Sequence, residues 1–412
     1  MKKPQILAPV GNWEMLTAAL NAGADEVYFG ADSLNMRVGT KQNFLLSDLP
    51  QIVSRCKEKN VKANLTMNIV MFDEDLQTAY QTVDAAKKAG VDNIIAMDFA
   101  VILYAFKQGL EVHASVQAGI TNFESAKFYA QYCDRIVLAR ECNLEQQKYI
   151  IEQILEHKIR GPKGKILEVE VFVHGALCVS ISGKCGMSLL ANNQSASRGR
   201  CTQPCRHKYE VRDVETGQKF EVDNEYVMSS GDLATIGFFD ELLATGVDVL
   251  KIEGRGKNPE YVDMTVRVYR EAVDAVVEGS YTPEKIINWQ TNLEKVYNRK
   301  LTQGYYLGKD VKEWSGTGGS LATEKKLYVG EVTRIFPKIN VFELKAVSTQ
   351  FKIDDELIII GSESGVFRIP VKSMHDEKGQ NIVESPKGEF VSIQTQEDRL
   401  KVKDKVYVIT KK

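Results

Sequence analysis

Four cysteines gather in one short stretch of the sequence. The stretch carries Cys178, Cys185, Cys201 and Cys205, with six, fifteen and three residues between successive members. Four thiolates can close a tetrahedral zinc site or hold an iron–sulfur cluster. Zinc ribbons usually carry two C-x2–4-C pairs, and only the second pair here fits, so the irregular spacing favours a cluster. Two other interpretations stay open: four ordinary thiols, or one cysteine acting as a nucleophile with His174.

The last two of these cysteines lie in a basic phrase, SASRGRCTQPCRHKY, residues 195–209. The basic phrase contains no acidic residue, and its four positive charges are Arg198, Arg200, Arg206 and Lys208. These charges can offset negative thiolates, or they can contact the phosphates of an RNA. Arg200 and Arg206 each neighbour a cysteine, so we expect them to serve the cysteine site. We expect Arg198 and Lys208, which lie farther from a cysteine, to bind RNA.

The elements that must position these residues follow a repeated rhythm of strand and helix. Eight β-rich runs alternate with amphipathic stretches, at residues 5–10, 26–30, 61–68, 93–98, 111–115, 135–140, 167–173 and 248–254. Three helix ends lead into the next strand in nearly the same phrase: NAGADEVYFG, KAGVDNIIAMD and ATGVDVLKIEG. Eight such units, with no GxGxxG after the first strand, predict an α/β fold of the (β/α)8 TIM-like barrel type rather than an open doubly wound sheet.

In such a barrel the active site lies where the strands end, so polar residues near each strand end are candidates. We expect these side chains to face one pocket: Asn12, Arg37, Asn64, Asn68, Asp98, Ser115, Gln117, Arg140, Glu141, His174, Glu253, Arg255 and Lys257. Arginine binds carboxylates through two parallel hydrogen bonds. The convergence of Arg37, Arg140 and Arg255 therefore predicts a small anionic ligand.

The sequence divides into a barrel domain and a smaller domain. The barrel domain spans residues 1–310, and a Cys-rich insert, residues 174–225, interrupts it after the seventh strand, with a hairpin expected at 208–222. Two long helices follow the eighth strand. Residues 311–325 include SGTGGS and are predicted to form a flexible linker. Residues 326–412 alternate at strand period, which predicts a small all-β, barrel-like domain.

The composition is that of a folded protein with ordinary charge. Among 412 residues, 53 Lys and Arg stand against 55 Asp and Glu, giving a formal net charge of −2. This excludes a highly basic coat, so any nucleic acid must bind a local patch. At 43% hydrophobic and 26% charged, the chain lacks the signature of disorder. Neither an export signal nor a transmembrane stretch is recognisable, so we expect a cytoplasmic protein with reduced cysteines.

Several phrases together resemble one family, the collagenase-like peptidases of unassigned catalytic type. The family's hallmark, E-x-F-x-x-G-(S/A)-x-C-x4-G-x-C-x-x-S, runs here from Glu170 through Cys178 and Cys185 to Ser188. The phrases APVGN, ADEVYFG, HASVQAGITN, VLARE, RGRCTQPCR and KIEGR extend the resemblance over residues 1–310.

The resemblance implies hydroxylation rather than simple proteolysis. The better-understood members look like RNA- or quinone-modifying hydroxylation proteins that hold a 4Fe–4S cluster. The R-G-x-C-x-Q-P-C-R phrase is similar to that of the prephenate-dependent tRNA hydroxylation proteins, which make 5-hydroxyuridine at the wobble position. The implied cofactors are the cluster and prephenate, or a similar carboxylate, as co-substrate. The implied partners are tRNA, with rRNA as the alternative, and the iron–sulfur assembly machinery, with no membrane.

Roles follow for the candidate residues under this hypothesis. The expected metal ligands are Cys178, Cys185, Cys201 and Cys205. The expected catalytic residues are Glu253, which acts as a base or orients a donor, His174 and Gln117. The expected substrate-binding residues are Arg37, Arg140, Arg255, Asn64 and Lys257, and the expected RNA-binding residues are Arg198 and Lys208.

Two alternatives belong to other classes of protein. One is a peptidase acting on collagen-like peptides, although the sequence has neither the HExxH helix of a zinc protease nor a GxSxG elbow. The other is a non-catalytic, zinc-stabilised RNA-binding partner of another modification enzyme.

Overall fold

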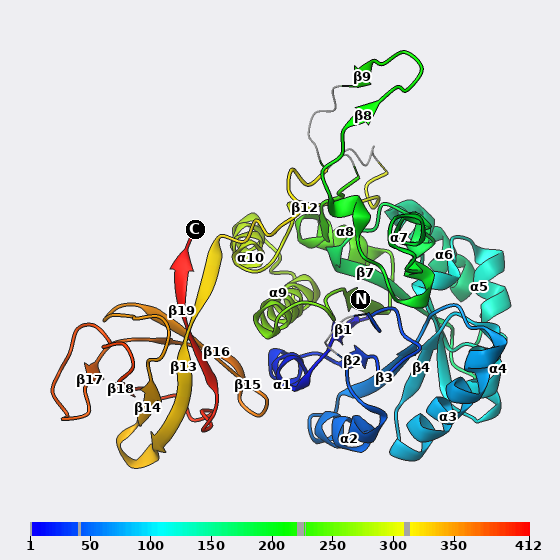
Figure 1. Ribbon diagram of the computed structural model, residues 1–412. Coiled ribbons are helices and arrows are strands. Elements are labelled where there is room, and N and C mark those ends of the chain that lie inside the picture. Colours follow the sequence, from blue (N-terminus) through cyan, green and yellow to red (C-terminus); the bar gives the residue numbers. More distant parts are fainter. Residues whose placement is uncertain (1, 40–42, 221–225, 227, 309–313) are drawn as a thin grey trace.

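The structure is a computed structural model that describes residues 2–39, 43–220, 226, 228–308 and 314–412. Figure 1 shows two parts, a barrel surrounded by helices and a smaller all-β domain that lies against one side of it. The chain begins in the barrel and ends in the β domain.

Eight parallel strands form the barrel, as the sequence predicts. They are β1 (Gln5–Pro9), β2 (Glu26–Phe29), β3 (Lys62–Met67), β4 (Asn93–Ala96), β5 (Glu111–Ala114), β6 (Arg135–Val137), β7 (Glu168–Ala176) and β11 (Val249–Ile252). Each strand pairs with the next one along the chain, and β11 pairs with both β1 and β7, which closes the barrel. Side chains alternate between the barrel interior and the helix layer.

Helices cover the outside of the barrel. They are α1 (Trp13–Ala22), α2 (Leu49–Glu58), α3 (Asp73–Ala89), α4 (Phe99–Lys107), α5 (Phe123–Tyr129), α6 (Leu144–Glu156), α8 (Phe239–Ala244), α9 (Pro259–Val277) and α10 (Pro283–Lys295). Two residues expected in the pocket instead begin helices, because the side chain of Asn12 accepts a hydrogen bond from Met15 N and that of Asp98 from Ala100 N. These two are N-cap residues, which satisfy otherwise unpaired N–H groups.

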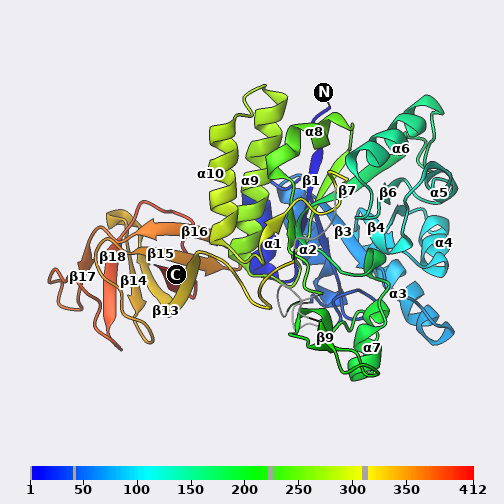
Figure 2. The ribbon, with the colours of Figure 1, turned by 90° about the horizontal axis from the view of Figure 1, so that it is seen from above.

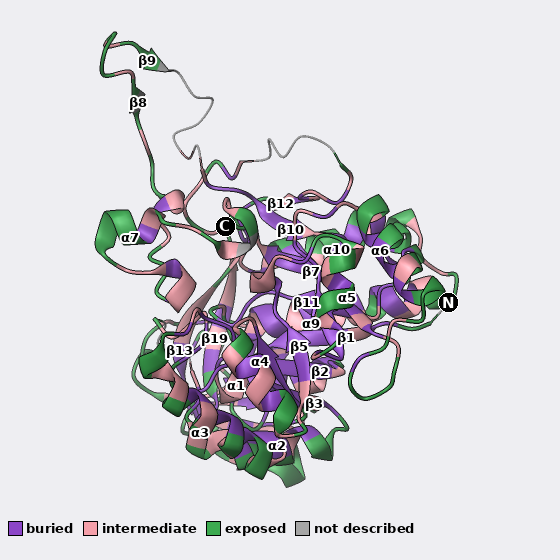
Figure 3. Ribbon diagram, turned by 90° about the vertical axis from the view of Figure 1, so that its right-hand side faces the viewer, coloured by how far each residue is buried: buried purple, intermediate pink, exposed green. Residues whose placement is uncertain are grey.

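The insert after β7 carries the short helix α7 (Met187–Asn192) and a hairpin of β8 (Val211–Arg212) and β9 (Lys219–Phe220). This hairpin confirms the central part of the hairpin predicted at residues 208–222. Residues 221 and 222 of the predicted segment lie outside the described residues. Figure 3 shows α7 and the hairpin projecting from the barrel with mostly exposed residues. The sequence did not predict β10 (Asp232–Ala234), which runs antiparallel to the end of β7, or β12 (Leu301–Thr302), which pairs with β10.

The C-terminal domain is a seven-stranded antiparallel sheet around its own core. Its strands are β13 (Glu324–Phe336), β14 (Val341–Lys345), β15 (Glu356–Gly361), β16 (Gly365–Pro370), β17 (Met374–His375), β18 (Phe390–Gln394) and β19 (Lys405–Lys411). Figure 2 shows it beside α9 and α10. Ala18 of α1 packs against Ile358 and Val366, and Thr17 Oγ1 donates to Ser362 O at 2.6 Å. This domain therefore contacts the outer helices rather than the strand ends.

The predicted linker 311–325 is held against the barrel over its described part. Ser315 N donates to Ser229 O at 2.7 Å, and Leu321 N donates to Asn298 O at 2.8 Å. Ser315 is buried. Residues 311–313 lie outside the described residues, and β13 begins at Glu324 within the predicted segment. The prediction that this whole segment is a flexible linker therefore does not hold for its described part, despite the glycines of SGTGGS.

None of the helices in the described part of the chain combines the length and apolar character needed to cross a membrane.

Candidate functional site

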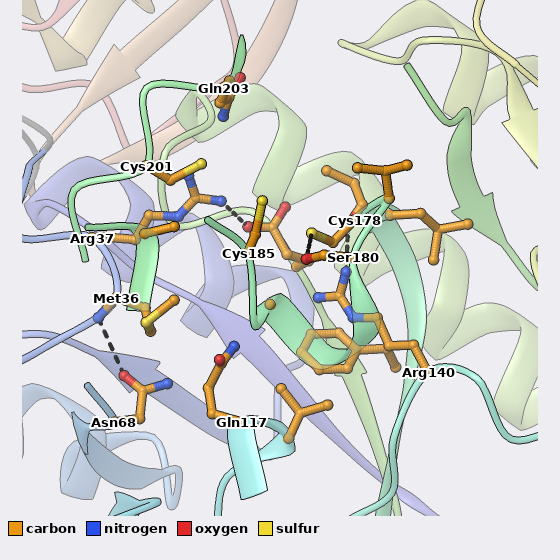
Figure 4. Close-up of a pocket in the computed structure, with 18 of the residues that line it drawn as sticks. Met36, Arg37, Asn68, Gln117, Arg140, Cys178, Ser180, Cys185, Cys201 and Gln203 are labelled. Carbon is orange, nitrogen blue, oxygen red and sulfur yellow. Dashed lines mark hydrogen bonds and ion pairs between the residues drawn. The ribbon is translucent and has the colours of Figure 1, made fainter. Parts of the chain in front are cut away.

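A cavity of about 220 Å³ lies where the barrel strands end, and the insert forms its other wall. Figure 4 shows residues from several strand ends and from the insert pointing toward one another. The cavity is lined by all four cysteines of the insert and by charged and polar side chains that include Tyr28, Arg37, Thr66, Asn68, Ser115, Gln117, Arg140, Glu141, Lys251, Glu253 and Arg255. The structure thus brings the cysteines and the three predicted arginines into one site.

The four cysteines are close enough to influence one another. Cys178 Sγ lies 3.0 Å from Ser180 Oγ, and Cys185 Sγ accepts from Met187 N at 3.4 Å. Burial raises the pKa of the Cys205 thiol, Arg206 lowers it, and the other three thiols raise it further. In the part of the chain that the structure describes, no three His, Cys, Asp or Glu side chains form a compact group around a single metal ion.

The other cysteines, Cys56, Cys133 and Cys142, are buried apart from this cavity. Burial raises the pKa of Cys56 and Cys133 to about 12 and that of Cys142 to about 11. Such thiols remain protonated and unreactive at neutral pH.

Two glycines allow the insert to lie against the barrel. Gly175 has a φ of +112°, and a Cβ there would come within 2.6 Å of Glu253 O. Gly199 has a φ of +80°, and a Cβ there would come within 2.3 Å of Asn35 O. Gly199 O also accepts from Gly39 N at 3.2 Å. Only glycine fits both conformation and space at these positions, so the HGA and RGR phrases bring the cysteines over the barrel mouth.

The three predicted arginines differ in their partners. Arg37 Nη2 lies 2.5 Å from Glu253 Oε1. Arg255 Nη1 donates to Thr66 Oγ1 at 2.8 Å. The guanidinium of Arg140 lies 3.9 Å from the ring centroid of Phe172, and it donates to the carbonyl of Ala176. Arg140 forms no ion pair with any carboxylate among the described residues. Its charge is therefore available to a ligand.

Glu253 is an ionised carboxylate in a buried position. Burial by itself raises the pKa of Glu253, but Arg37, Lys257 and Arg140 outweigh it and hold the pKa at about 2. Its Oε1 binds Arg37, whereas its Oε2 is buried and accepts no hydrogen bond among the described residues. An acid this strong is a poor base at neutral pH. The low pKa argues against the role of a base, and the role of orienting a donor stays a prediction.

Besides Asn12 and Asp98, three further residues predicted to face the pocket do not line the cavity. His174 packs against Tyr261 and Tyr269 of α9, and burial lowers its pKa to about 3. The amide of Asn64 donates to Glu26 Oε2 at 3.1 Å and to Val27 O, below the cavity. Lys257 Nζ lies 3.2 Å from the ring centroid of Tyr297. These three side chains are therefore not part of the lining of this cavity, and the roles predicted for them stay predictions.

Other residues were missed by the sequence analysis. Phe172, Tyr28 and Lys251 line the cavity from inside the barrel strands rather than from the loops after them. The alternation of side chains along a strand could have identified Lys251. It precedes Glu253 by two residues, so the two side chains point to the same side of the sheet. The predicted Gln117 lies on a short 3-10 helix, Val116–Ala118, and does line the cavity.

The basic phrase serves mainly to hold the insert. Arg198 Nη1 lies 2.5 Å from Asp75 Oδ2, and its guanidinium covers the ring of Phe72 at 4.5 Å. Arg206 donates to Ser229 Oγ at 2.9 Å and to Leu177 O at 2.7 Å. The sequence predicts that Arg198 contacts phosphates, but in the structure Arg198 pairs with Asp75 and covers Phe72. Arg200 and Lys208 are exposed, with Lys208 Nζ 5.7 Å from the ring of Tyr226.

The closed barrel and the thiol-lined cavity over its strand ends define the class, an α/β barrel protein with its site at the barrel mouth. The family follows from comparison with known proteins. The model of the family described as peptidase family U32 matches residues 11–316. The chain belongs to peptidase family U32, which confirms the resemblance found in the sequence.

Two relatives and one solved structure are similar to this chain. A protein named "Collagenase" from Porphyromonas gingivalis (strain ATCC BAA-308 / W83) is 43% identical over 408 residues, 99% of this chain and 98% of that protein. A "tRNA hydroxylation protein P1" from Bacillus subtilis (strain 168) is 30% identical over 392 residues, 92% of this chain and 89% of that protein. The structure titled "The Structure of the U32 Peptidase Mk0906" has a TM-score of 0.40 and 14% identity, covering 62% of this chain and 94% of that chain.

Proposed function

We propose that this chain is an RNA hydroxylase, and that its substrate is the wobble uridine of tRNA, converted to 5-hydroxyuridine in the cytoplasm. The relative named tRNA hydroxylation protein P1 covers 92% of the chain and supports this proposal. The single observation that carries it is the cavity, which combines four thiols with a set of arginines at one barrel mouth. A wobble base lies in a single-stranded loop, so it can enter such a cavity without the opening of a duplex.

The four cysteines are the residues that would hold a 4Fe–4S cluster. One zinc ion with bonds of about 2.3 Å needs its four sulfur atoms within about 4 Å of each other. The four thiols line one cavity but form no compact group of that kind among the described residues. Four thiolates are the donor set of a 4Fe–4S cube, so four cysteines at one cavity suit that group in residue type and number. When bound, the cluster would supply the redox step of the hydroxylation.

A small carboxylate such as prephenate is the proposed co-substrate. Arg140 presents a guanidinium to the cavity from the face of Phe172, and Arg255 lies in the same cavity. Guanidinium groups bind carboxylates through paired, charge-assisted hydrogen bonds. Glu253 Oε2 is left as an acceptor for a hydroxyl or N–H of whichever ligand reaches it. The chain thus binds and orients its ligands by charge and by hydrogen bonds.

Proteolysis is the function that the name of the first relative suggests. A cysteine peptidase needs a histidine within hydrogen-bond reach of its cysteine. His174 is directed toward Tyr269, with His174 Nδ1 3.4 Å from the hydroxyl, and does not line the cavity that holds the cysteines. We therefore place hydroxylation ahead of proteolysis.

Nucleoside analysis of a deletion strain tests this proposal. Loss of the gene should remove 5-hydroxyuridine from tRNA, and the wild-type gene should restore it. Cys205→Ser should fail to restore it and should lower iron and sulfide in protein purified without oxygen. Cys133→Ser is the matched control, since Cys133 is buried elsewhere, and should behave as wild type.

Two results would overturn the proposal in different ways. Unchanged tRNA with a missing hydroxylated nucleoside in rRNA would move the substrate to rRNA. Normal hydroxylation by Cys205→Ser with less than one iron atom per chain would remove the cluster from the proposal.

A further inference from the structure

The lining of the cavity carries a cation that the proposed function has not used. Lys251 lines the cavity and is 5% exposed. Its Nζ lies 4.5 Å from the ring centroid of Tyr28 and 5.5 Å from that of Phe172. Two aromatic faces at this distance favour a positive charge between them.

The same two rings carry the neighbouring arginines. Arg140 lies over Phe172, and Arg255 lies 5.7 Å from the ring centroid of Tyr28. Three cations are thus grouped around two rings in one small cavity, with Lys251 as the middle member. Like charges brought together in a buried space repel each other, and an anion placed among them relieves the repulsion.

A network beneath the cavity holds Lys251 in place. Lys251 Nζ lies 2.7 Å from Glu170 Oε1. Glu170 Oε2 lies 3.4 Å from Arg135 Nη1, and Arg135 in turn makes a two-pronged pair with Glu26. Glu170 and Arg135 are fully buried, so these pairs are little screened by water. One of the three protons of Lys251 is used here, which leaves two for a ligand.

We propose that Lys251 is a ligand-binding residue of the cavity, that it binds an anionic group of a small dianion, and that Glu170 positions it. The inference rests on the proposed function for the identity of the small ligand. It also gives a physical reason for the Glu170 and Phe172 positions of the hallmark phrase, because one holds the ammonium group of Lys251 and the other contacts it through its ring.

Ligand binding by the full chain, purified without oxygen and measured without RNA, tests this inference. The probes are prephenate, malonate and inorganic phosphate, which separate a dicarboxylate site from a phosphate site. Lys251→Met should weaken binding of the preferred probe about ten- to one-hundred-fold, the range expected for one charge-assisted contact. Lys251→Arg, which keeps the charge, should restore part of the affinity.

Lys62→Met is the matched control. Lys62 Nζ lies 3.3 Å from Glu26 Oε1 in the same network, but Lys62 does not line the cavity. Its loss should lower stability and leave probe binding within about twofold of wild type. A role of Lys251 in folding alone would make the two variants alike in probe binding, which would overturn the inference.

Lys251→Met alone leaves the buried Glu170 with only its longer contact to Arg135, which can destabilise the fold of that variant. The double variant Lys251→Met with Glu170→Gln removes both charges and keeps the test valid. Glu170→Gln should weaken binding when Lys251 is present and have no further effect when Lys251 is Met, as coupled residues do. Wild-type affinity in the double variant, or no binding of any probe by wild type, would overturn the inference.

Failure of the inference and failure of the proposed function are separable. A chain that binds a dianion through Lys251 but leaves tRNA and rRNA unmodified would support the inference and contradict the proposed function. If the Lys251→Met variant hydroxylates tRNA as well as the wild type does, the proposed function is supported and the inference is contradicted.

Discussion

The interior of the barrel has two polar levels that differ in how fully their charges are matched within the protein. In the lower level, Arg135 is fully buried and is matched by Glu26 and Glu168, with each contact between 2.7 and 2.9 Å. In the cavity above it, Arg140 contacts a ring and a carbonyl, and Glu253 Oε2 accepts nothing among the described residues. Charges matched within the protein support the fold, whereas unmatched polar groups are available to a ligand.

The largest effect should come from the lower level. Arg135→Met removes the buried cation that Glu26 and Glu170 share, and leaves them only their contacts with Lys62 and Lys251. Breaking a buried pair by removal of one member typically costs about 3–5 kcal/mol. We therefore expect a loss of this size in the free energy of unfolding, measured with urea. Arg140→Met should cost less than about 1 kcal/mol of stability, and an equal loss in both variants would refute the distinction between the two levels.

Acid should weaken both levels. Burial opposes ionisation of Glu26 and Glu253, but Arg135 in the first case and Arg37 in the second hold the pKa at about 2, below the ordinary 4.5. A lowered pKa gives stability that is present above pH 4.5 and is lost as the pH falls toward 2, on the order of 3 kcal/mol per carboxylate. Unfolding by urea at pH 6, 4 and 3 should show this fall. The fall should be smaller in Glu253→Gln, and an unchanged pH dependence in that variant would contradict the low pKa.

A smaller effect is expected for ligand binding at the upper level. Arg140→Met should weaken carboxylate binding by roughly 1.5–3 kcal/mol, or about one to two decades in affinity. Arg140→Lys keeps the charge but loses the paired hydrogen bonds and the flat contact with Phe172, so it should recover only part. Calorimetric titration of prephenate measures both. Arg334→Met on the C-terminal domain is the control, and full binding by Arg140→Lys would exclude paired recognition at this position.

The smallest effect should lie at the rim, where the basic phrase meets solvent. Lys208→Ala removes one exposed cation and should lower the log–log slope of tRNA affinity against salt by about one. Arg198→Ala should leave that slope unchanged and lower the Tm, because Arg198 pairs with Asp75. Salt titrations and thermal melts of the two variants decide between these roles. A reduced slope for Arg198→Ala alone would restore the original prediction.

The barrel was predictable because its signal is local and repeated. Eight apolar runs, helix-ending glycines and polar strand ends each follow from short-range physics, and all eight barrel strands are present. Strands β10 and β12 were missed because they are three and two residues long and form only when the insert folds back on β7. The arginines and Gln117 were found because they follow strands that end at one mouth.

The misplaced residues show where sequence reasoning ended. Alternation along β7 predicts that His174 points inward with Glu170 and Phe172. The register between β7 and β11 shifts by one residue between Phe172 and His174, and this bulge turns His174 toward Tyr269 instead. Asn64 does point inward, but at the level of Glu26 rather than of the cavity. Its height depends on the stagger of neighbouring strands, which one strand's sequence does not encode.

The sequence by itself determined the barrel, the family and the four cysteines, because each depends on residue types at fixed spacing along the chain. Only the tertiary structure decided which charges are paired within the fold and which remain for a ligand. Arg135 and Arg140 are five residues apart and alike in chemistry, yet one meets three carboxylates and the other meets none among the described residues. That difference depends on partners from distant strands, whose approach is fixed only when the barrel closes.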